Sequence, residues 1–316
     1  MTLVLLPDTI TLDPRLPDGV RTAQYDVHQP IPEQWRDAEV LVAWGNPTDR
    51  LAEAARNLHG LRWVQSLAAG PDAVLAAGFD PQVQVTSGRG LHDGPVAEHT
   101  LALVLALARR LPDAVRAGQR RQWSTDLGGL QPIPGSDGAG FTSLCGARVL
   151  IWGFGSIAAR LAPALTLLGA QVAGIASTAG ERAGYPVVTA AEAMDLLPRT
   201  DVLIDILPAT AATRRIIDDG VLRRLPAHAV FVNVGRGSTV DEGALVHALQ
   251  DGRLAGAALD VTAVEPLPAD SPLWDLPNLL LTPHAAGGRP VGADTLLSDN
   301  IAAFHRGEPL RNQVRR

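Results

Sequence analysis

The sequence contains little cysteine and few aromatic residues, and it carries no surplus of positive charge. Its one cysteine, Cys145, cannot form an internal disulfide, which favours a reducing compartment. Aromatic residues make up 4% of the 316 residues, so Ala, Val and Leu must fill the core. The formal net charge of −6 argues against a general nucleic-acid-binding protein, which would need a basic surface.

Other absences concern membranes and metals. The apolar run at residues 3–6 lacks the layout of a signal peptide, and the run at 101–108 is too short to span a bilayer. The eight histidines show no metal-ligand spacing with one another or with Cys145, so we predict no metal site. Together these observations predict a cytoplasmic protein without a membrane or nucleic-acid partner.

The most informative stretch that is present reads RVLIWGFGSIA at residues 148–158. It predicts a buried strand, a glycine turn and a helix, in the G-x-G-x-x-A form of a dinucleotide-binding pattern. Gly153 permits the sharp turn, and Gly155 lets a pyrophosphate approach the backbone. Ser156 and Ile157 open the helix, whose N-terminal N–H groups suit phosphate. The pattern alone is common, and its context has to support it.

Apolar strand segments alternate with helical segments along the whole chain. Strands are predicted at 3–6, 40–43, 62–65, 83–85, 148–152, 171–175, 201–203, 229–232, 255–259 and 278–281. This alternation indicates parallel sheets covered on both faces by helices. We therefore expect two Rossmann-like or flavodoxin-like doubly wound α/β domains with an inter-domain cleft.

The predicted domains are a substrate-binding (catalytic) domain, residues 1–93 plus 290–316, and an NAD(P)-binding Rossmann domain, residues 94–289. Residues 124–142 are rich in Gly, Ser and Pro, and we predict a loop there.

Three polar residues of the second half each follow an apolar strand: Arg236, Glu265 and His284. In a parallel sheet, such positions line the crevice at the carboxyl ends of the strands. Each residue alone also fits an ordinary role as a surface charge, a solvated turn or a loop histidine. All three together, on a domain with a dinucleotide pattern, predict an active site.

The sequence around these residues contains longer motifs: NVGRGSTVDEGAL at 233–245, GAALDVTAVEPLP at 256–268, SPLW at 271–274 and NLLLTPHAAG at 278–287, with PVAEH at 95–99. These segments resemble the arginine, glutamate and histidine motifs of the D-isomer-specific 2-hydroxyacid dehydrogenases, and the chain looks like their glyoxylate/hydroxypyruvate reductase-like members. The first sixty residues match only in architecture.

The resemblance implies an NAD(P)-dependent oxidoreductase that interconverts a small anionic 2-keto acid and a D-2-hydroxy acid. Arg236 would hold the keto acid with its planar guanidinium and polarise the carbonyl. His284 would exchange the proton of the substrate oxygen, while Glu265 would hold the other ring nitrogen and favour the imidazolium form.

Further binding residues follow from the same resemblance. The substrate carboxylate would meet the backbone of Leu67, Ala68, Ala69 and Gly70. The cofactor would contact Leu207, Pro208, Thr213, Val234, Asp260 and Gly287. A strand-end cap for Asp260 and a helix N-cap for Thr213 are the structural alternatives. The family also implies a homodimer.

One position departs from the usual pattern. The acidic residue expected at the end of the second nucleotide strand, which would bind the ribose hydroxyls, is replaced by Ala176. Ser177 and Thr178 follow and could bind a 2′-phosphate, with Arg182 close in sequence. The sequence therefore favours NADP(H) over NAD(H).

Two other functions stay open at this point. Some relatives of these enzymes are dinucleotide-sensing corepressors, which can retain all three active-site residues. The second alternative is an enzyme of the same fold with an unusual substrate, such as phosphite. No motif identifies the substrate, because its pocket is shaped partly by the weakly matched first domain.

Overall fold

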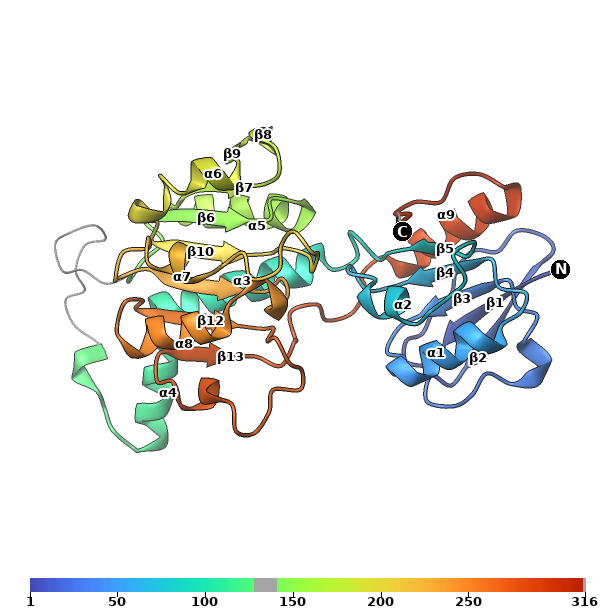
Figure 1. Cartoon of the computed structure of the whole chain (residues 1–316), viewed down its shortest axis with the longest axis horizontal. Coiled ribbons are helices and arrows are strands. Elements are labelled where there is room, and N and C mark those ends of the chain that lie inside the picture. The colour runs from blue at the N-terminus through green and yellow to red at the C-terminus, as the bar shows by residue number, and fades with distance from the viewer. Residues whose placement is uncertain (128–140, 315–316) are drawn as a thin grey trace. The chain divides into compact units, whose positions relative to one another are not determined.

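The computed structural model describes residues 1–127 and 141–314, so most of the predicted loop at 124–142 lies outside the described residues. The chain divides into two compact units (Figure 1). Unit 1 comprises Met1–His92 and Arg289–Arg316, and unit 2 comprises Asp93–Gly288. Within the described ranges, no helix is long and apolar enough to cross a membrane.

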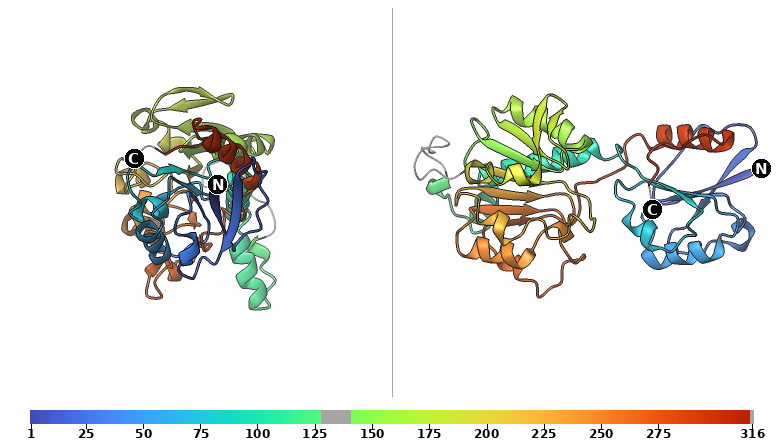
Figure 2. Two further views of the ribbon diagram at one scale, coloured as in Figure 1. Left: turned by 90° about the vertical axis from the view of Figure 1, so that its right-hand side faces the viewer. Right: turned by 45° about the horizontal axis from the view of Figure 1, so that its top comes forward.

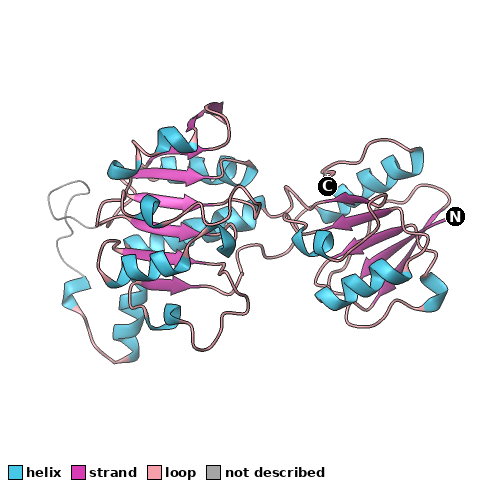
Figure 3. Cartoon of the chain, in the orientation of Figure 1, coloured by secondary structure: helices cyan, strands magenta, loops and turns pink. Residues whose placement is uncertain are grey.

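Unit 1 is a parallel sheet with helices on both faces (Figure 3). Its strands are β1 (Thr2–Pro7), β2 (Val20–Tyr25), β3 (Val40–Ala43), β4 (Trp63–Ser66) and β5 (Gln84–Thr86), in the order β2-β1-β3-β4-β5. Its helices are η1 (Glu33–Trp35), α1 (Thr48–Asn57), α2 (Asp72–Ala76) and α9 (Ala293–Arg306). This strand order is that of flavodoxin-like folds.

The two faces of this sheet carry separate apolar clusters. Leu51 of α1 and Val74 of α2 pack with Leu5 and Leu41 on one face. On the other face, α9 contributes Leu297 and Ile301 to a cluster with Val4 and Val40. Strands that are buried on both faces need near-continuous apolar sequences, which is why β1 and β3 were predictable.

Strand β2 was not predicted from the sequence. Its residues, VRTAQY, are exposed or half-buried except for Tyr25, because β2 is an edge strand paired with β1 alone among the described strands. An edge strand buries little side-chain surface, so its sequence shows neither a continuous apolar run nor a clear alternation. Its position was decided by backbone pairing to β1 over the whole length of both strands.

Unit 2 contains the larger sheet. Its strands are β6 (Arg148–Trp152), β7 (Gln171–Ile175), β8 (Gly180–Arg182), β9 (Tyr185–Val188), β10 (Val202–Asp205), β11 (Val230–Asn233), β12 (Gly256–Leu259) and β13 (Leu279–Leu281). Their order is β13-β12-β11-β10-β6-β7-β9-β8. Only the β8–β9 pair is antiparallel among the described strand pairs, and it forms a hairpin at one edge (Figure 2).

Helices cover both faces of this sheet too. Helices α3 (Asp93–Ala108) and α5 (Ser156–Leu167) pack on one face. Helices α6 (Ala190–Ala193), α7 (Asp219–Leu222) and α8 (Glu242–Gln250) pack on the other. The remaining helical elements of the unit are α4 (Leu111–Gln119), η2 (Thr125–Leu127), η3 (Leu197–Arg199), η4 (Gly237–Thr239) and η5 (Pro272–Asp275). The prediction of two doubly wound parallel-sheet α/β folds is confirmed.

The order of unit 2 has a topological switch point between β6 and β10. From β6 the chain builds outward through β7 and β9, and from β10 it builds in the opposite direction to β13. In such sheets, ligands bind outside the carboxyl ends of the strands at the switch point. The predicted nucleotide turn follows β6, so it lies at this place in the fold.

Candidate active site

The nucleotide turn has the geometry that its glycines predict. Gly153 has φ +100°, and a Cβ there would lie 2.7 Å from the carbonyl oxygen of Ile206. Gly155 caps α5, and a Cβ placed on it would meet no atom within 4 Å. The space above Gly155 and the first-turn N–H groups of α5 together suit a pyrophosphate. The residues therefore fit a bound dinucleotide. Ser156 donates its hydroxyl to Asp93 at 3.1 Å.

Arg182 lies between this turn and the end of β7. Its Nη1 donates to the carbonyl oxygen of Phe154 at 3.2 Å, and its Nη2 donates to Thr178 Oγ1 at 2.8 Å. The β8–β9 hairpin, which was not predicted from the sequence, carries the arginine to this position. Ser177 and Thr178 are exposed. A guanidinium and two hydroxyls therefore gather where an acidic residue would otherwise bind ribose.

The loop after β10 is closed on itself by Thr213. Its hydroxyl donates to the carbonyl oxygen of Pro208 at 2.6 Å and accepts from the N–H of Thr210 at 2.9 Å. No helix begins there. The next helix, α7, has Asp218 as its N-cap, so the N-cap alternative for Thr213 is wrong. Leu207 is half-buried and Pro208 exposed at the carboxyl end of β10.

His284 and Glu265 form the pair that the sequence predicts. His284 Nδ1 lies 2.7 Å from Glu265 Oε2. The other carboxylate oxygen of Glu265 accepts the N–H of Thr262 at 2.9 Å, so both oxygens are held. His284 has φ +52°, an uncommon conformation for a residue with a side chain. A histidine held through Nδ1 presents Nε2 for proton exchange.

Asp260 shapes the loop that carries His284. It is 2% exposed and accepts the N–H groups of Ala285 at 2.8 Å and Ala286 at 2.9 Å. It also accepts the hydroxyl of Thr282 at 2.6 Å, and its backbone carbonyl accepts the N–H of His284 at 2.7 Å. This geometry matches the strand-end capping alternative. Contact with a cofactor stays a prediction for Asp260.

His99 is a residue of this cluster that the sequence analysis did not identify as part of the site. From α3, its Nε2 lies 3.0 Å from Thr282 Oγ1 and 3.3 Å from Asp260 Oδ1. Because Thr282 donates its one hydroxyl proton to Asp260, His99 donates to Thr282. The available signal was the PVAEH motif, in which His99 follows the helix start by only a few residues.

Arg236 follows β11 in a tight backbone turn. Its Nη1 donates to the carbonyl oxygen of Gly235 at 2.8 Å, and its side chain is partly exposed. The next residue, Gly237, passes so close to Thr262 that a Cβ would lie 1.9 Å from the Thr262 carbonyl carbon. Only glycine allows this approach. Val234, just before the turn, is buried and pairs its N–H with the carbonyl oxygen of Asp205 at 3.0 Å.

A cavity of about 610 Å³ adjoins His284. Glu265, Asp260 and His284 line it together with the apolar side chains of Leu267, Trp274 and Leu281. The cavity brings together three of the predicted site residues on a partly apolar wall. Arg236 is not among its lining residues, and Gly287 lies in the loop just beyond His284.

The predicted substrate-carboxylate loop follows β4 in unit 1. The side chain of Leu67 is buried, its N–H bonds to Ala43, and its carbonyl oxygen lies 2.7 Å from His92 Nε2. The N–H of Ala68 donates to Ser66 Oγ at 3.2 Å. Within the described residues, the N–H groups of Ala69 and Gly70 have no acceptor. They are the groups of this loop that can receive a carboxylate.

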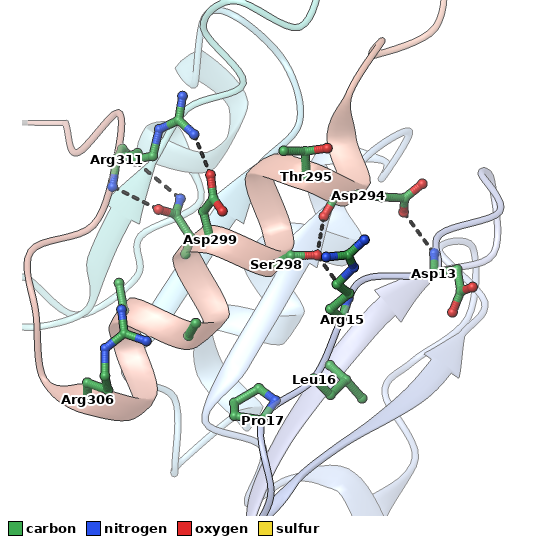
Figure 4. Close-up of a pocket in the computed structure, with 13 residues that line it drawn as sticks. Asp13, Arg15, Leu16, Pro17, Asp294, Thr295, Ser298, Asp299, Arg306 and Arg311 are labelled. Carbon is green, nitrogen blue, oxygen red and sulfur yellow. Dashed lines mark hydrogen bonds and ion pairs between the residues drawn. The ribbon is translucent and has the colours of Figure 1, made fainter.

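A larger cavity of about 880 Å³ lies in unit 1, between residues 13–17 and α9 (Figure 4). The N–H of Asp13 donates to Asp294 and that of Arg15 donates to Ser298, each at 2.8 Å. These bonds attach the β1–β2 connection to α9. None of the predicted site residues lines this cavity. The larger cavity therefore lies where a loop packs on a helix, and the predicted site residues Asp260, Glu265 and His284 line the smaller cavity of unit 2.

Comparisons with known proteins identify the family of the chain. Residues 101–286 match the family model described as the D-isomer-specific 2-hydroxyacid dehydrogenase NAD binding domain. The chain is 33% identical over 296 residues to a glyoxylate/hydroxypyruvate reductase A of Klebsiella pneumoniae, covering 89% of this chain and 87% of the relative.

Solved structures extend the similarity to both units. A D-isomer-specific 2-hydroxyacid dehydrogenase family protein of Aeromonas salmonicida aligns with a TM-score of 0.83 and 30% identity, over 99% of this chain and 98% of the other. An NADPH-dependent glyoxylate/hydroxypyruvate reductase of Sinorhizobium meliloti, in complex with NADP and sulfate, aligns with a TM-score of 0.79 and 27% identity, over 99% and 98%. The fold, the paired His284 and Glu265 and these matches lead to one conclusion. The chain belongs to the D-isomer-specific 2-hydroxyacid dehydrogenase family.

Proposed function

We propose that this enzyme uses NADPH to reduce a small 2-keto acid of the glyoxylate or hydroxypyruvate type to the 2-hydroxy acid. The observation that carries the proposal is the His284–Glu265 pair at 2.7 Å beside a cavity of about 610 Å³. The names of the similar Klebsiella and Sinorhizobium reductases support the substrate class.

The proposed chemistry divides between the cofactor and the protein. NADPH, which the turn at Gly153 and Gly155 and the first turn of α5 would hold, would supply the hydride for the carbonyl carbon of the keto acid. His284 supplies the proton that the ketone oxygen then requires, from Nε2, and takes it back in the reverse direction. Glu265 keeps Nδ1 protonated and the ring oriented, so that Nε2 faces the substrate.

Substrate orientation is assigned to Arg236 and to the loop after β4. The guanidinium of Arg236 is planar and permanently charged, so it can hold the carboxylate and polarise the ketone. The N–H groups of Ala69 and Gly70 would receive a carboxylate oxygen. This proposal assigns the carboxylate-binding loop to unit 1, and the cofactor site together with Arg236 to unit 2.

The preference for NADPH rests on the end of β7. Arg182, Ser177 and Thr178 provide a positive charge and two hydroxyls, and no carboxylate occupies the position of Ala176. A 2′-phosphate would accept from the Arg182 guanidinium in charge-assisted hydrogen bonds. The remaining predicted cofactor contacts are Gly153, Gly155, Ser156, Ile157, Leu207, Pro208, Thr213, Val234, Asp260 and Gly287.

We also propose that the enzyme is a cytoplasmic homodimer. The family resemblance implies dimerisation through the nucleotide-binding domain. On this domain, Leu111 and Val115 of α4 are 49% and 60% exposed, and Trp123 is 93% exposed. A second copy would cover this apolar surface. The reaction consumes reduced cofactor, which is available in the cytoplasm.

A substrate panel tests the proposal directly. Initial rates are measured with a series of 2-keto acids, each against NADPH and NADH. We expect turnover of the smallest keto acids and a lower KM for NADPH. Cofactor binding without turnover of any keto acid would instead support a dinucleotide-sensing protein, and turnover of phosphite alone would support a phosphite dehydrogenase. A strong preference for NADH would contradict the cofactor proposal.

A further inference from the structure

A carboxyl group is buried at the switch point of the unit 2 sheet. Asp205 is the last residue of β10 and is 0% exposed. In the strand register it pairs with Trp152 of β6 on one side and Asn233 of β11 on the other. The first of these precedes the nucleotide turn, and the second begins the motif that carries Arg236. Asp205 is therefore central to the site, although the proposed chemistry does not use it.

Asp205 is connected to the Arg236 turn through one hydroxyl group. Its Oδ1 accepts the N–H of Leu207 at 2.9 Å. Its Oδ2 lies 2.5 Å from Thr239 Oγ1. The same Thr239 oxygen lies 2.5 Å from the carbonyl oxygen of Arg236. Thr239 is itself 0% exposed, so no solvent molecule replaces these partners without a rearrangement.

The number of protons available to Asp205, Thr239 and the Arg236 carbonyl indicates whether the Asp205 carboxyl group is charged. A threonine hydroxyl donates one hydrogen bond, and the carbonyl of Arg236 can only accept. If Asp205 were ionised, one of the two 2.5 Å contacts of Thr239 would join two acceptors with no proton between them. If Asp205 is neutral, it donates to Thr239, and Thr239 donates to Arg236. The geometry therefore points to a protonated Asp205.

The environment of the carboxyl group agrees with this assignment. Burial raises the pKa of Asp205 to about 7, against the opposing effect of its hydrogen bonds with Thr239 and Leu207. The neighbouring elements face it with Trp152, Asn233, Thr239 and Leu207, none of which titrates near neutral pH. The charged residues beside this hydrogen-bonded chain are Arg236 and the ion pair of Arg215 with Asp241, and Arg215 bonds through its N–H to the carbonyl oxygen of Ser238 at 2.9 Å.

We propose that Asp205 is a positioning residue whose neutral form holds the backbone of Arg236 through Thr239, and whose ionisation weakens the binding of the keto-acid carboxylate. The proposal rests on the substrate-binding role of Arg236 proposed above. It adds a residue that touches neither substrate nor cofactor and that sets the pH range of substrate binding.

The consequence of ionisation follows from the same contacts. When Asp205 releases its proton to solvent, the hydroxyl proton of Thr239 turns to the carboxylate. The carbonyl of Arg236 then loses this donor and still accepts from the Asn233 side-chain amide at 3.1 Å and the Thr239 N–H at 3.2 Å.

Steady-state kinetics with the Asp205→Asn and Thr239→Val enzymes test the link to Arg236. An asparagine amide cannot ionise but can still donate to Thr239 and accept from Leu207. Between pH 6 and pH 8, we expect the keto-acid KM of the natural enzyme to rise about threefold to tenfold relative to Asp205→Asn, with a smaller change in the kcat ratio. His284 and its partner Glu265 are present in both proteins, so their contribution to the pH profile cancels from the ratio. Equal KM profiles would overturn the proposal.

Thr239→Val keeps the carboxyl group but removes the hydroxyl link. We expect its keto-acid KM to be higher than that of the natural enzyme already at pH 6, because no hydroxyl group links the neutral Asp205 carboxyl to the Arg236 carbonyl. A KM at pH 6 equal to that of the natural enzyme would contradict the positioning role. This second variant also preserves the test if Asp205→Asn does not fold.

Thermal unfolding as a function of pH tests the protonation without any substrate. A folded-state pKa near 7, above the unfolded value of 3.8, gives stability that is present at low pH and lost as pH rises through 7. From pH 5 to pH 8, we expect the Tm of the natural protein to fall by about 5 °C relative to Asp205→Asn. Asp195→Asn, at an exposed site of the same unit, should leave the slope unchanged.

The two measurements separate the possible failures. Parallel Tm curves would show that Asp205 is ionised, which overturns this inference alone. Absence of turnover with every keto acid would overturn the proposed function, while the Tm comparison would still report the charge state of Asp205.

Discussion

At the scale of single residues, the proposed chemistry depends on how firmly His284 is held. Glu265 binds its Nδ1 at 2.7 Å, and the carboxylate is in turn fixed by the N–H of Thr262 at 2.9 Å. The backbone of His284 is anchored to Asp260 at 2.7 Å. A histidine fixed through Nδ1 and through its backbone N–H offers its remaining ring nitrogen in one orientation, which general acid–base catalysis requires.

Replacing His284 with alanine should therefore remove the proton donor and leave the nucleotide turn intact. We expect kcat for keto-acid reduction to fall by about 10²–10⁴, with the Kd of NADPH unchanged. Stopped-flow or steady-state rates give kcat, and fluorescence titration gives Kd. Keto-acid reduction by this variant at a rate comparable to the natural enzyme would rule out His284 as the acid.

Arg182 is the second residue whose role can be isolated. Its Nη2 donates to Thr178 at 2.8 Å, beside the place where a 2′-phosphate would lie. Arg182→Gln should raise the KM for NADPH about tenfold or more and change that for NADH little, since a charge-assisted hydrogen bond contributes about 1.5–3 kcal/mol. Arg199→Gln, an exposed arginine of the same unit, serves as the control. Equal effects on both cofactors would contradict the assignment.

At the scale of elements, the backbone between β11 and α8 is shaped by contact with the loop after β12. Gly237 of η4 lies against Thr262, where a Cβ would be 1.9 Å from the carbonyl carbon. Because backbone cannot move aside as a flexible side chain can, this contact determines the path of the chain next to Arg236.

Gly237→Ala should thus displace the turn that carries Arg236. We expect a loss of about 3 kcal/mol or more in the free energy of unfolding, and a higher keto-acid KM in any folded fraction. Gly243→Ala in the first turn of α8 is the matched control, because its Cβ would meet only Asp241 Oδ1 at 3.5 Å. The control should be neutral or slightly stabilising. Similar Tm values for both variants would show that the η4 contact is easily relieved.

At the scale of the whole molecule, the proposed homodimer gives a measurable outcome. Leu111 and Val115 lie one turn apart on α4, so their exposed side chains share a face of the helix. Val115→Glu would place a charge in the proposed interface. We expect light scattering with size-exclusion chromatography to change from the mass of a dimer toward that of a monomer.

The matched control for the dimer is Val291→Glu. Val291 is 67% exposed and belongs to unit 1, outside the nucleotide-binding domain to which the family resemblance assigns dimerisation. This variant should keep the mass of the natural protein. A natural protein that is monomeric would contradict the homodimer. A Val115→Glu protein that remains a dimer would show that the interface does not include this face of α4.

Much of this protein could be predicted from local sequence. Apolar runs and glycine turns report backbone conformation directly, so the two doubly wound sheets and the turn at Gly153 were predictable. The motifs around Arg236, Glu265 and His284 were sufficient for the family, because each is a short continuous segment. Edge elements were missed, since β2 and β8 bury too little surface to impose a pattern.

Contacts between residues far apart in the sequence were determined by the tertiary structure alone. Thr239 meets Asp205 across 34 positions, and His99 meets Thr282 across 183. Such pairs leave no periodic signal, because each partner alone looks like an ordinary polar residue beside a strand or on a helix. Sequence by itself determined the family to which the motifs belong. Parallel pairing brings the carboxyl ends of strands that are distant in sequence to the same edge of the sheet. This pairing places Asp205 close enough to Arg236 for the hydroxyl of Thr239 to link them.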